Sequence, residues 1–187
     1  MREDSYSNLS DGELVEGLQR GEEGAFDEVF HRYRRLVFAY LRGKTGDRHL
    51  AEDIVEETFI ALVRNAARID AARGVRGWLF RTARNRAVDA LRQRQFETPV
   101  EDVYPAELPG KAVSPAERVV AGESAQLVRK ALSDLPERER DLMILRFYGG
   151  LTFRETAHVL KRPLGTVLWQ ARKILGKLKA EMGRGKS

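Results

Sequence analysis

The chain has 187 residues, enough for one domain or two small ones, and it carries a net charge of +5. It contains no cysteine, which excludes disulfides and thiolate metal sites and fits a reducing cytoplasm. No apolar run resembles a signal peptide or approaches membrane-spanning length. The charge is unevenly distributed, because residues 11–28 are acidic and residues 161–187 are basic. We therefore expect a cytoplasmic protein with several macromolecular partners.

Helix signals dominate the chain, and the alternation typical of strands is absent. Three capping-box pairs, in which each side chain bonds the other residue's backbone N–H, are expected to begin helices: Ser10 with Glu13, Ser114 with Glu117, and Thr152 with Glu155. The apolar spacing predicts helices over residues 10–20, 24–43, 47–68, 76–94, 115–132, 136–148, 152–160 and 164–180. The fold class is therefore expected to be all-α.

A proline-rich segment separates the fourth predicted helix from the fifth. It also carries more acids than bases, which is typical of an extended, flexible connector. The expected organisation is one small helical domain over residues 1–95, an acidic linker over 96–123 and a second helical domain over 124–187. A plain solvated tether between two domains would explain the prolines equally well.

The segment AEDIVEETFIAL, residues 51–62, carries acids four residues apart and no base. Its predicted buried stripe consists of Leu50, Ile54, Ala61 and Leu62. Phe59 and Val63 are expected at the edge of that stripe, while Ile60 projects among the acids. An ordinary charged helix would mix signs, whereas acids around an exposed apolar residue are typical of a surface that docks a basic protein partner.

The segment RGWLFRTARNRAVDALRQR, residues 76–94, holds six arginines and one acid. Its apolar side chains share one arc, which predicts a core face made of Leu79, Phe80, Ala83, Ala87, Ala90 and Leu91. Arginines bind phosphates, an indole stacks on an unpaired base and an amide reads a base edge, so the other face suits single-stranded DNA. In the alternative, Trp78 folds back onto the core and the arginines form a solvated surface.

Residues 151–179 predict a helix-turn-helix, with a short capped helix, a turn and a longer basic helix. The core face of the second helix is expected to comprise Val167, Ala171, Ile174 and Leu178. Residues expected to contact duplex DNA are Arg154, Lys161, Thr166, Trp169, Gln170, Arg172, Lys173 and Lys177. A helical hairpin without DNA contacts is the alternative.

Three segments in this order resemble an extracytoplasmic-function (ECF) sigma factor: AEDIVEETF, RGWLFRTARNRAVDALR, and ALSDLPERERDLMILRFYGGLTFRETA followed by PLGTV. The resemblance covers residues 25–94, which match the family's region 2, and about 124–180, which match region 4. It implies an alternative transcription initiation factor that performs no bond chemistry and needs no cofactor. Its implied partners are promoter DNA, core RNA polymerase through the β′ coiled coil and the β flap, and an anti-sigma factor that wedges between the domains.

The resemblance assigns a task to each surface. The acidic helix would grip the β′ coiled coil through Asp53, Glu56, Glu57 and Ile60. The loop over residues 69–77 would capture a flipped base of the −10 element. Residues implied to contact the melted strand are Arg73, Arg76, Trp78, Arg81, Arg84, Asn85 and Arg92. The helix-turn-helix would read the −35 element, and the acidic linker would run toward the active-site and RNA-exit channel. The active protein is expected at the nucleoid, and an anti-sigma factor could hold it near the membrane.

Four residues in two segments depart from the family pattern. Leu168, Trp169 and Gln170 follow GTV where a lysine, a small residue and an arginine are usual, and Ile69 replaces a common aromatic residue. We therefore expect an unusual −35 preference or weaker reliance on that element.

Two other classes of protein are weighed against this one. A LuxR-type regulator has a similar helix-turn-helix, but its front domain is usually α/β rather than helical. An enzyme is not expected, because His31, His49 and His158 are scattered and no catalytic or metal-binding motif is present.

Overall fold

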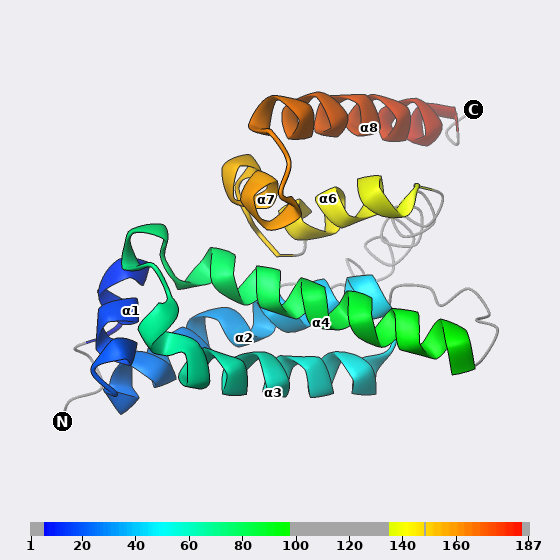
Figure 1. Ribbon diagram of the computed structural model, residues 1–187. Coiled ribbons are helices and arrows are strands. Elements are labelled where there is room, and N and C mark those ends of the chain that lie inside the picture. The colour runs from blue at the N-terminus through cyan, green and yellow to red at the C-terminus, as the bar shows by residue number, and fades with distance from the viewer. Residues whose placement is uncertain (1–5, 98–134, 148, 185–187) are drawn as a thin grey trace, which may run out of the picture.

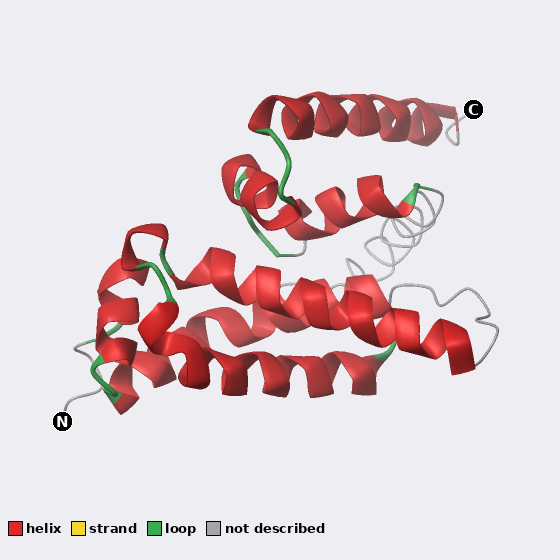
Figure 2. Ribbon diagram, viewed as in Figure 1, coloured by secondary structure: helices red, strands yellow, loops and turns green. Residues whose placement is uncertain are grey.

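The computed structural model describes residues 6–97, 135–147 and 149–184, and all regular structure in these ranges is helical (Figure 1, Figure 2). The first group of helices comprises α1 (Asp11–Gln19), α2 (Glu23–Thr45), α3 (Arg48–Asn65) and α4 (Val75–Glu97). Two short 3-10 turns, η2 (Ala66–Arg68) and η3 (Ala71–Arg73), connect α3 to α4. The second group comprises α6 (Glu137–Phe147), α7 (Phe153–Leu160) and α8 (Leu164–Arg184). The expected all-α fold is confirmed for the described residues.

The helix ends follow from local hydrogen bonding. At the start of α1 the Glu13 carboxylate accepts the Ser10 N–H at 2.7 Å while the Ser10 hydroxyl accepts the Glu13 N–H. Thr152 and Glu155 form the same reciprocal pair at α7. Two of the three predicted capping boxes are therefore confirmed. The third, Ser114 with Glu117, and the predicted helix over 115–132 lie outside the described residues.

The core of the first domain lies between α2, α3 and α4, with α1 closing one end (Figure 1). Leu79, Phe80, Ala83 and Ala87 of α4 are buried, as their spacing predicts, whereas Ala90 is half-buried. Phe59 was wrongly placed at the edge of the α3 stripe, because its side chain is only 3% exposed.

The ring of Phe59 lies 4.9 Å from the ring of Phe30 and 6.4 Å from that of Phe26, in edge-to-face contacts. Both partners belong to α2, so the neighbouring helix widens the buried surface beyond the stripe visible on α3 alone.

The second domain is built on a helix-turn-helix formed by α7 and α8. Lys161 ends α7 in the left-handed conformation, with φ 53°. The N–H of Arg162 donates to the Ala157 carbonyl at 2.9 Å, and the N–H of Lys161 donates to the His158 carbonyl. This Schellman arrangement turns the chain into α8. Val167, Ala171 and Ile174 of α8 are buried as predicted, while the side chain of Leu178 lies outside the described set.

The two domains pack against each other. In Figure 1 the layer of α6, α7 and α8 lies over the layer of α2, α3 and α4. α4 contacts α7, and α2 contacts α6. This packing brings the basic face of α4 close to the second domain and decides how much of that face solvent can reach.

Candidate protein-docking and nucleic-acid surfaces

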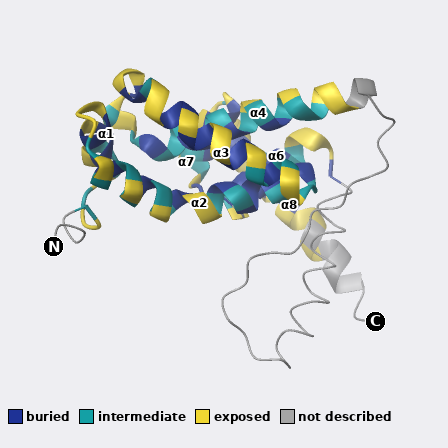
Figure 3. Ribbon diagram, turned by 90° about the horizontal axis from the view of Figure 1, so that it is seen from below, coloured by how far each residue is buried: buried dark blue, intermediate teal, exposed yellow. Residues whose placement is uncertain are grey.

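The outer face of α3 carries the predicted docking residues. Asp53, Glu56 and Glu57 are exposed, and Ile60 is 51% exposed. In Figure 3 exposed stretches alternate with buried ones along α3. Glu57 accepts a hydrogen bond from Arg86 of α4. Within the described part of the chain, Asp53 and Glu56 form no ion pair. These two carboxylates are therefore available to a basic partner.

A groove of about 410 Å³ runs between α2 and α3 beside these acids. Its apolar walls are Phe30, Phe38 and Val55, and Glu56 lies on its rim. Its remaining lining residues are Arg34, Arg35, Arg48 and Glu52. Sequence reasoning missed this feature because it treated α3 alone. The adjacent arginines Arg34 and Arg35 of α2 could have indicated the groove in the sequence. They make the surface basic on the α2 side, whereas it is acidic on the α3 side.

The loop between α3 and α4 packs against α1. The Gln19 side chain donates to the carbonyl oxygen of Ile69 at 2.9 Å. Ile69 itself is buried in the core and is not presented to solvent. Arg73, in contrast, is exposed and forms an ion pair with Asp70 at 3.0 Å. The predicted base-capture loop therefore offers Arg73 at its surface, whereas Ile69 anchors it from inside.

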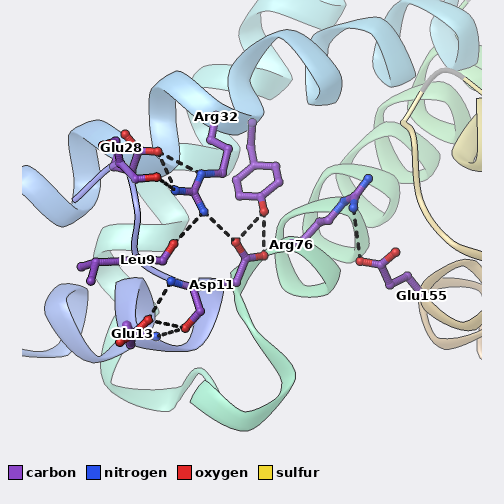
Figure 4. A network of polar contacts seen from close by, with 10 residues as sticks. Leu9, Asp11, Glu13, Glu28, Arg32, Arg76 and Glu155 are labelled. Atoms are coloured by element: carbon purple, nitrogen blue, oxygen red, sulfur yellow. Dashed lines mark hydrogen bonds and ion pairs between the residues drawn. The ribbon is translucent and has the colours of Figure 1, made fainter. Parts of the chain in front are cut away.

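A polar network ties α1 to α2 next to this loop. The Tyr33 hydroxyl donates to Asp11 at 2.6 Å, and Arg32 bridges Asp11 to Glu28 (Figure 4). Burial and the neighbouring Asp11 carboxylate raise the pKa of Tyr33, so the hydroxyl remains a donor. The network fixes the end of the domain from which α4 starts.

The predicted strand-binding residues of α4 do not share one environment. Asn85 and Arg92 are exposed, as expected. Trp78 is half-buried and packs against the hydrophobic core, which agrees with the alternative interpretation of the indole. Arg76, Arg81 and Arg84 all contact the second domain.

Arg84 and Lys44 meet a single carboxylate of the second domain. Arg84 donates to Asp141 Oδ2 through Nε at 3.1 Å and through Nη2 at 3.0 Å. Lys44 Nζ lies 2.6 Å from Asp141 Oδ1 and 2.9 Å from Glu137. The Lys44 and Asp141 side chains are 4% and 2% exposed, whereas the Arg84 side chain is 27% exposed, so the cluster is buried except on the side of Arg84. The Lys44 ammonium also lowers the pKa of Glu137.

Arg76 and Arg81 extend the contact toward α7. Arg76 donates to the carbonyl oxygens of Gly149 and Gly150 and lies 3.5 Å from Glu155 (Figure 4). Arg81 contacts the ring nitrogen Nε2 of His158. Desolvation, together with the charges of Arg81 and Arg73, lowers the pKa of His158, which favours the neutral form of the ring.

The helix-turn-helix presents a basic surface. Exposed residues of the predicted duplex-binding set are Arg154, Lys161, Thr166, Trp169, Arg172, Lys173 and Lys177. Trp169 is 62% exposed, and the Lys173 ammonium lies 5.2 Å from the centre of its ring. Gln170 is half-buried, because its amide oxygen accepts a hydrogen bond from Arg162 at 3.1 Å. Helical spacing predicted an outward-pointing Gln170, but its side chain is partly buried and bonded to Arg162.

The described residues contain no group of three His, Asp or Glu side chains placed to hold a metal ion. Within the same ranges, no helix is both long and apolar enough to cross a bilayer.

Comparison with known proteins covers both domains. Residues 29–97 match Sigma-70 region 2, and residues 131–180 match Sigma-70 region 4. The chain is 32% identical over 163 residues to the ECF RNA polymerase sigma factor SigM of Bacillus subtilis, across 85% of this chain and 96% of that protein. It is also 29% identical to the RNA polymerase sigma-H factor of Pseudomonas aeruginosa, across 89% of this chain and 92% of that protein.

Two solved structures share the fold. CnrH, solved with the cytosolic domain of CnrY, aligns with a TM-score of 0.69 at 22% identity, over 93% of this chain and 97% of CnrH. The sigma factor RpoE of Bartonella quintana, solved with the anti-sigma factor NepR, aligns with a TM-score of 0.68 at 20% identity, over 84% of this chain and 96% of RpoE.

Proposed function

This chain belongs to the ECF family of RNA polymerase sigma factors, and we propose that its surfaces divide the family's task between them. As a member, it binds core RNA polymerase and directs transcription initiation at promoters, and it performs no bond chemistry of its own. The observation that carries this conclusion is the similarity to ECF sigma factors along both domains. The same similarity removes the LuxR-type alternative, which shares only the helix-turn-helix.

The acidic face of α3 docks on core polymerase in this proposal. Its support is the pair of carboxylates, Asp53 and Glu56, that no described basic residue neutralises, together with exposed Ile60. The groove between α2 and α3 adds an apolar surface beside them, formed by Phe30, Phe38 and Val55. Basic side chains on a coiled coil, the β′ element that the family resemblance implies, would complement the charge of these two carboxylates.

The α4 face and its preceding loop bind the melted −10 strand. Exposed Arg73, Asn85 and Arg92 are the residues that a strand can reach in the observed arrangement. Arg76, Arg81 and Arg84 join them when the second domain moves away. Trp78 supports the face from the core side, and its exposed edge is a candidate stacking surface.

The helix-turn-helix reads the −35 duplex. Thr166 and Trp169 lie near the start of α8, from which side chains reach base edges, while Arg172, Lys173 and Lys177 lie further along and suit phosphates. The cation–π contact of Lys173 with Trp169 holds both side chains on the same surface.

Control by an anti-sigma factor is also proposed, as is action at the nucleoid in the cytoplasm. An anti-sigma factor could in addition hold the inactive chain near the membrane. RpoE, whose fold this chain shares, was solved with such a protein bound.

The direct test of function adds the purified chain to core polymerase on a genomic template library. Promoter-specific transcripts absent from core polymerase alone are expected. A template choice that does not change on addition of the chain would remove the proposal.

The docking assignment is tested by charge reversal at Asp53→Lys or Glu56→Lys. Each variant is expected to lose stable association with core polymerase, because a carboxylate–cation attraction becomes repulsion. Co-purification with core polymerase measures the loss, and circular dichroism checks the fold. The matched control is Glu16→Lys, which makes the same charge change at an exposed site on α1. Equal binding by the α3 variants and the control would refute the docking surface.

A further inference from the structure

The second helix of the helix-turn-helix, α8, presents an indole on its outward face. Val167, Ala171 and Ile174 define the buried face of this helix. Because successive residues of a helix are turned by about 100°, Trp169 lies on the side opposite to that buried face. Trp169 is 62% exposed, and α8 lies on the far side of α6 and α7 from the first domain (Figure 1). The ring is therefore free to enter a DNA groove.

The indole is positioned by its neighbours on the same face of α8. Side chains of a helix lean toward its N-terminus, so the ring of Trp169 leans toward the turn that contains Gly165. A Cβ atom built at Gly165 would meet no heavy atom within 4 Å, so this turn leaves open space. On the other side, the Lys173 ammonium lies 5.2 Å from the ring centre. The ring thus has a cation toward the end of the helix and open space toward its start.

Gln170, the neutral hydrogen-bonding residue next to this indole, is poorly placed to read a base. Glutamine recognises adenine through both its amide oxygen and its amide N–H groups. The amide oxygen of Gln170 accepts a hydrogen bond from Arg162 at 3.1 Å, and Gln170 is half-buried. Of these two neighbouring residues, Trp169 is therefore the one that is free to meet a base edge.

An aromatic ring recognises a different part of a base from a polar side chain. The major-groove edges of the four bases carry one apolar group, the C5-methyl group of thymine. Cytosine has no such methyl group and presents an amino donor instead. A ring face that covers the methyl group removes apolar surface from water, and this contact favours thymine over cytosine.

We propose that Trp169 determines specificity at the −35 element through apolar contact with the methyl group of a thymine. The inference rests on the proposed function of the helix-turn-helix, and it names the chemical group that this motif reads. The family pattern has a small residue where this chain has Trp169. The indole therefore adds a requirement for thymine that a small side chain at this position does not impose.

The duplex that the chain reads is first obtained by selection. The full-length chain, bound to core polymerase, is mixed with duplexes that carry a randomised segment, and the enriched sequences define the element. Each thymine of one enriched duplex is then replaced singly by deoxyuridine, which removes only the methyl group. Fluorescence anisotropy at one fixed salt concentration measures the affinities. One replacement is expected to weaken binding by the parent complex about fourfold, the effect of one buried methyl-sized group.

Variants of Trp169 test whether the indole is the group that meets this methyl. Trp169→Ala should bind the thymine duplex at least about fourfold less tightly than the parent. It should also bind the thymine and deoxyuridine duplexes equally, because the contact is lost from both sides of the comparison. Trp169→Phe retains a ring but lacks the indole N–H, so it should retain most of the preference for thymine.

The matched control is Leu168→Ala. It truncates another exposed apolar side chain of α8, about 100° around the helix from Trp169. This variant should retain the full preference for thymine over deoxyuridine. Circular dichroism checks that every variant is folded as the parent chain is.

An equal effect of deoxyuridine on the parent and on Trp169→Ala would overturn the inference. So would an enriched duplex that no thymine replacement weakens, or a selection that enriches no duplex. A preference lost as completely in Trp169→Phe as in Trp169→Ala would assign the reading to the indole N–H and overturn the methyl contact. Failure of the proposed function is a different result, namely that polymerase with the chain gives no promoter-specific transcript, whatever the duplex affinities are.

Discussion

Arg84 and Asn85 are neighbours in the sequence, yet they face different surroundings. Arg84 is bound to a buried carboxylate 57 positions away, whereas Asn85 is exposed on the same helix. The family resemblance assigned both to the strand-binding face of α4. Which polar residue meets solvent and which meets another domain depends on the packing of α6 and α7.

Arg92 tests the strand-binding surface at the scale of one residue, because it is exposed in the closed arrangement, in which the two domains pack against each other. Arg92→Ala is expected to weaken promoter binding by the polymerase complex and to reduce the slope of log affinity against log salt by about one, the change expected for one lost phosphate contact. Titration at several salt concentrations measures both quantities. Arg64→Ala, at an exposed arginine of α3, is the control, and an unchanged slope for Arg92→Ala would exclude a phosphate contact there.

At the scale of the element, the two faces of α3 differ in character. Its inner face buries Phe59, Ile54 and Leu62, and its outer face presents Asp53 and Glu56. Burial of the inner face stabilises the helix against the repulsion between its like charges. The exposed position of Asp53 and Glu56, which form no ion pair among the described residues, is therefore maintained by core packing rather than by polar contacts of their own.

Phe59→Ala should destabilise the first domain by about 3–5 kcal/mol, because it removes a buried ring and leaves a cavity between α2 and α3. Urea unfolding followed by circular dichroism measures the change in the free energy of unfolding. Phe59→Leu, which retains most of the volume, should cost clearly less. A loss below about 1 kcal/mol for the alanine variant would mean that the aromatic cluster is not a central part of the core.

At the scale of the whole molecule, the closed arrangement contains a group that titrates near neutral pH. His158 faces Arg81 of α4 and Arg73 of η3, and both cations disfavour a protonated ring. Arg76 and Glu155 form the adjacent cross-domain pair. The closed arrangement is therefore more stable when His158 is neutral, and the pKa of His158 lies below the ordinary value of 6.5.

The sign of the pH dependence follows from this lowered pKa. Well above pH 6.5 the ring is neutral in both the open and the closed chain, so closure has its full stability. As the pH falls below 6.5, the open chain binds the proton first, and closure weakens until the lowered pKa is passed. Energy transfer between two dyes, one attached to each domain, should decrease over this range. His158→Gln should remove the dependence, while a decrease of equal size in that variant would assign it to other groups.

Much of the architecture could be predicted from local patterns. Hydrogen bonds and side-chain periodicity within one helix can be predicted from the sequence. They determine the capping pairs at Ser10 and Thr152 and the buried face of Val167, Ala171 and Ile174. Helix periodicity also predicted the exposed position of Ile60 among acids. The division of labour between docking and DNA-binding surfaces remains a prediction that the proposed experiments test.

The sequence by itself determined the helical fold and the family, because helix periodicity, caps and ordered motifs are properties of contiguous residues. Only the tertiary structure decided that Phe59 is buried, that the groove of α2 and α3 mixes charges, and that Asp141 meets Arg84 and Lys44. Each of these depends on which face of one helix meets which face of another across long sequence separations. A single-helix pattern contains no information about that choice, since the partner surface supplies half of the interaction.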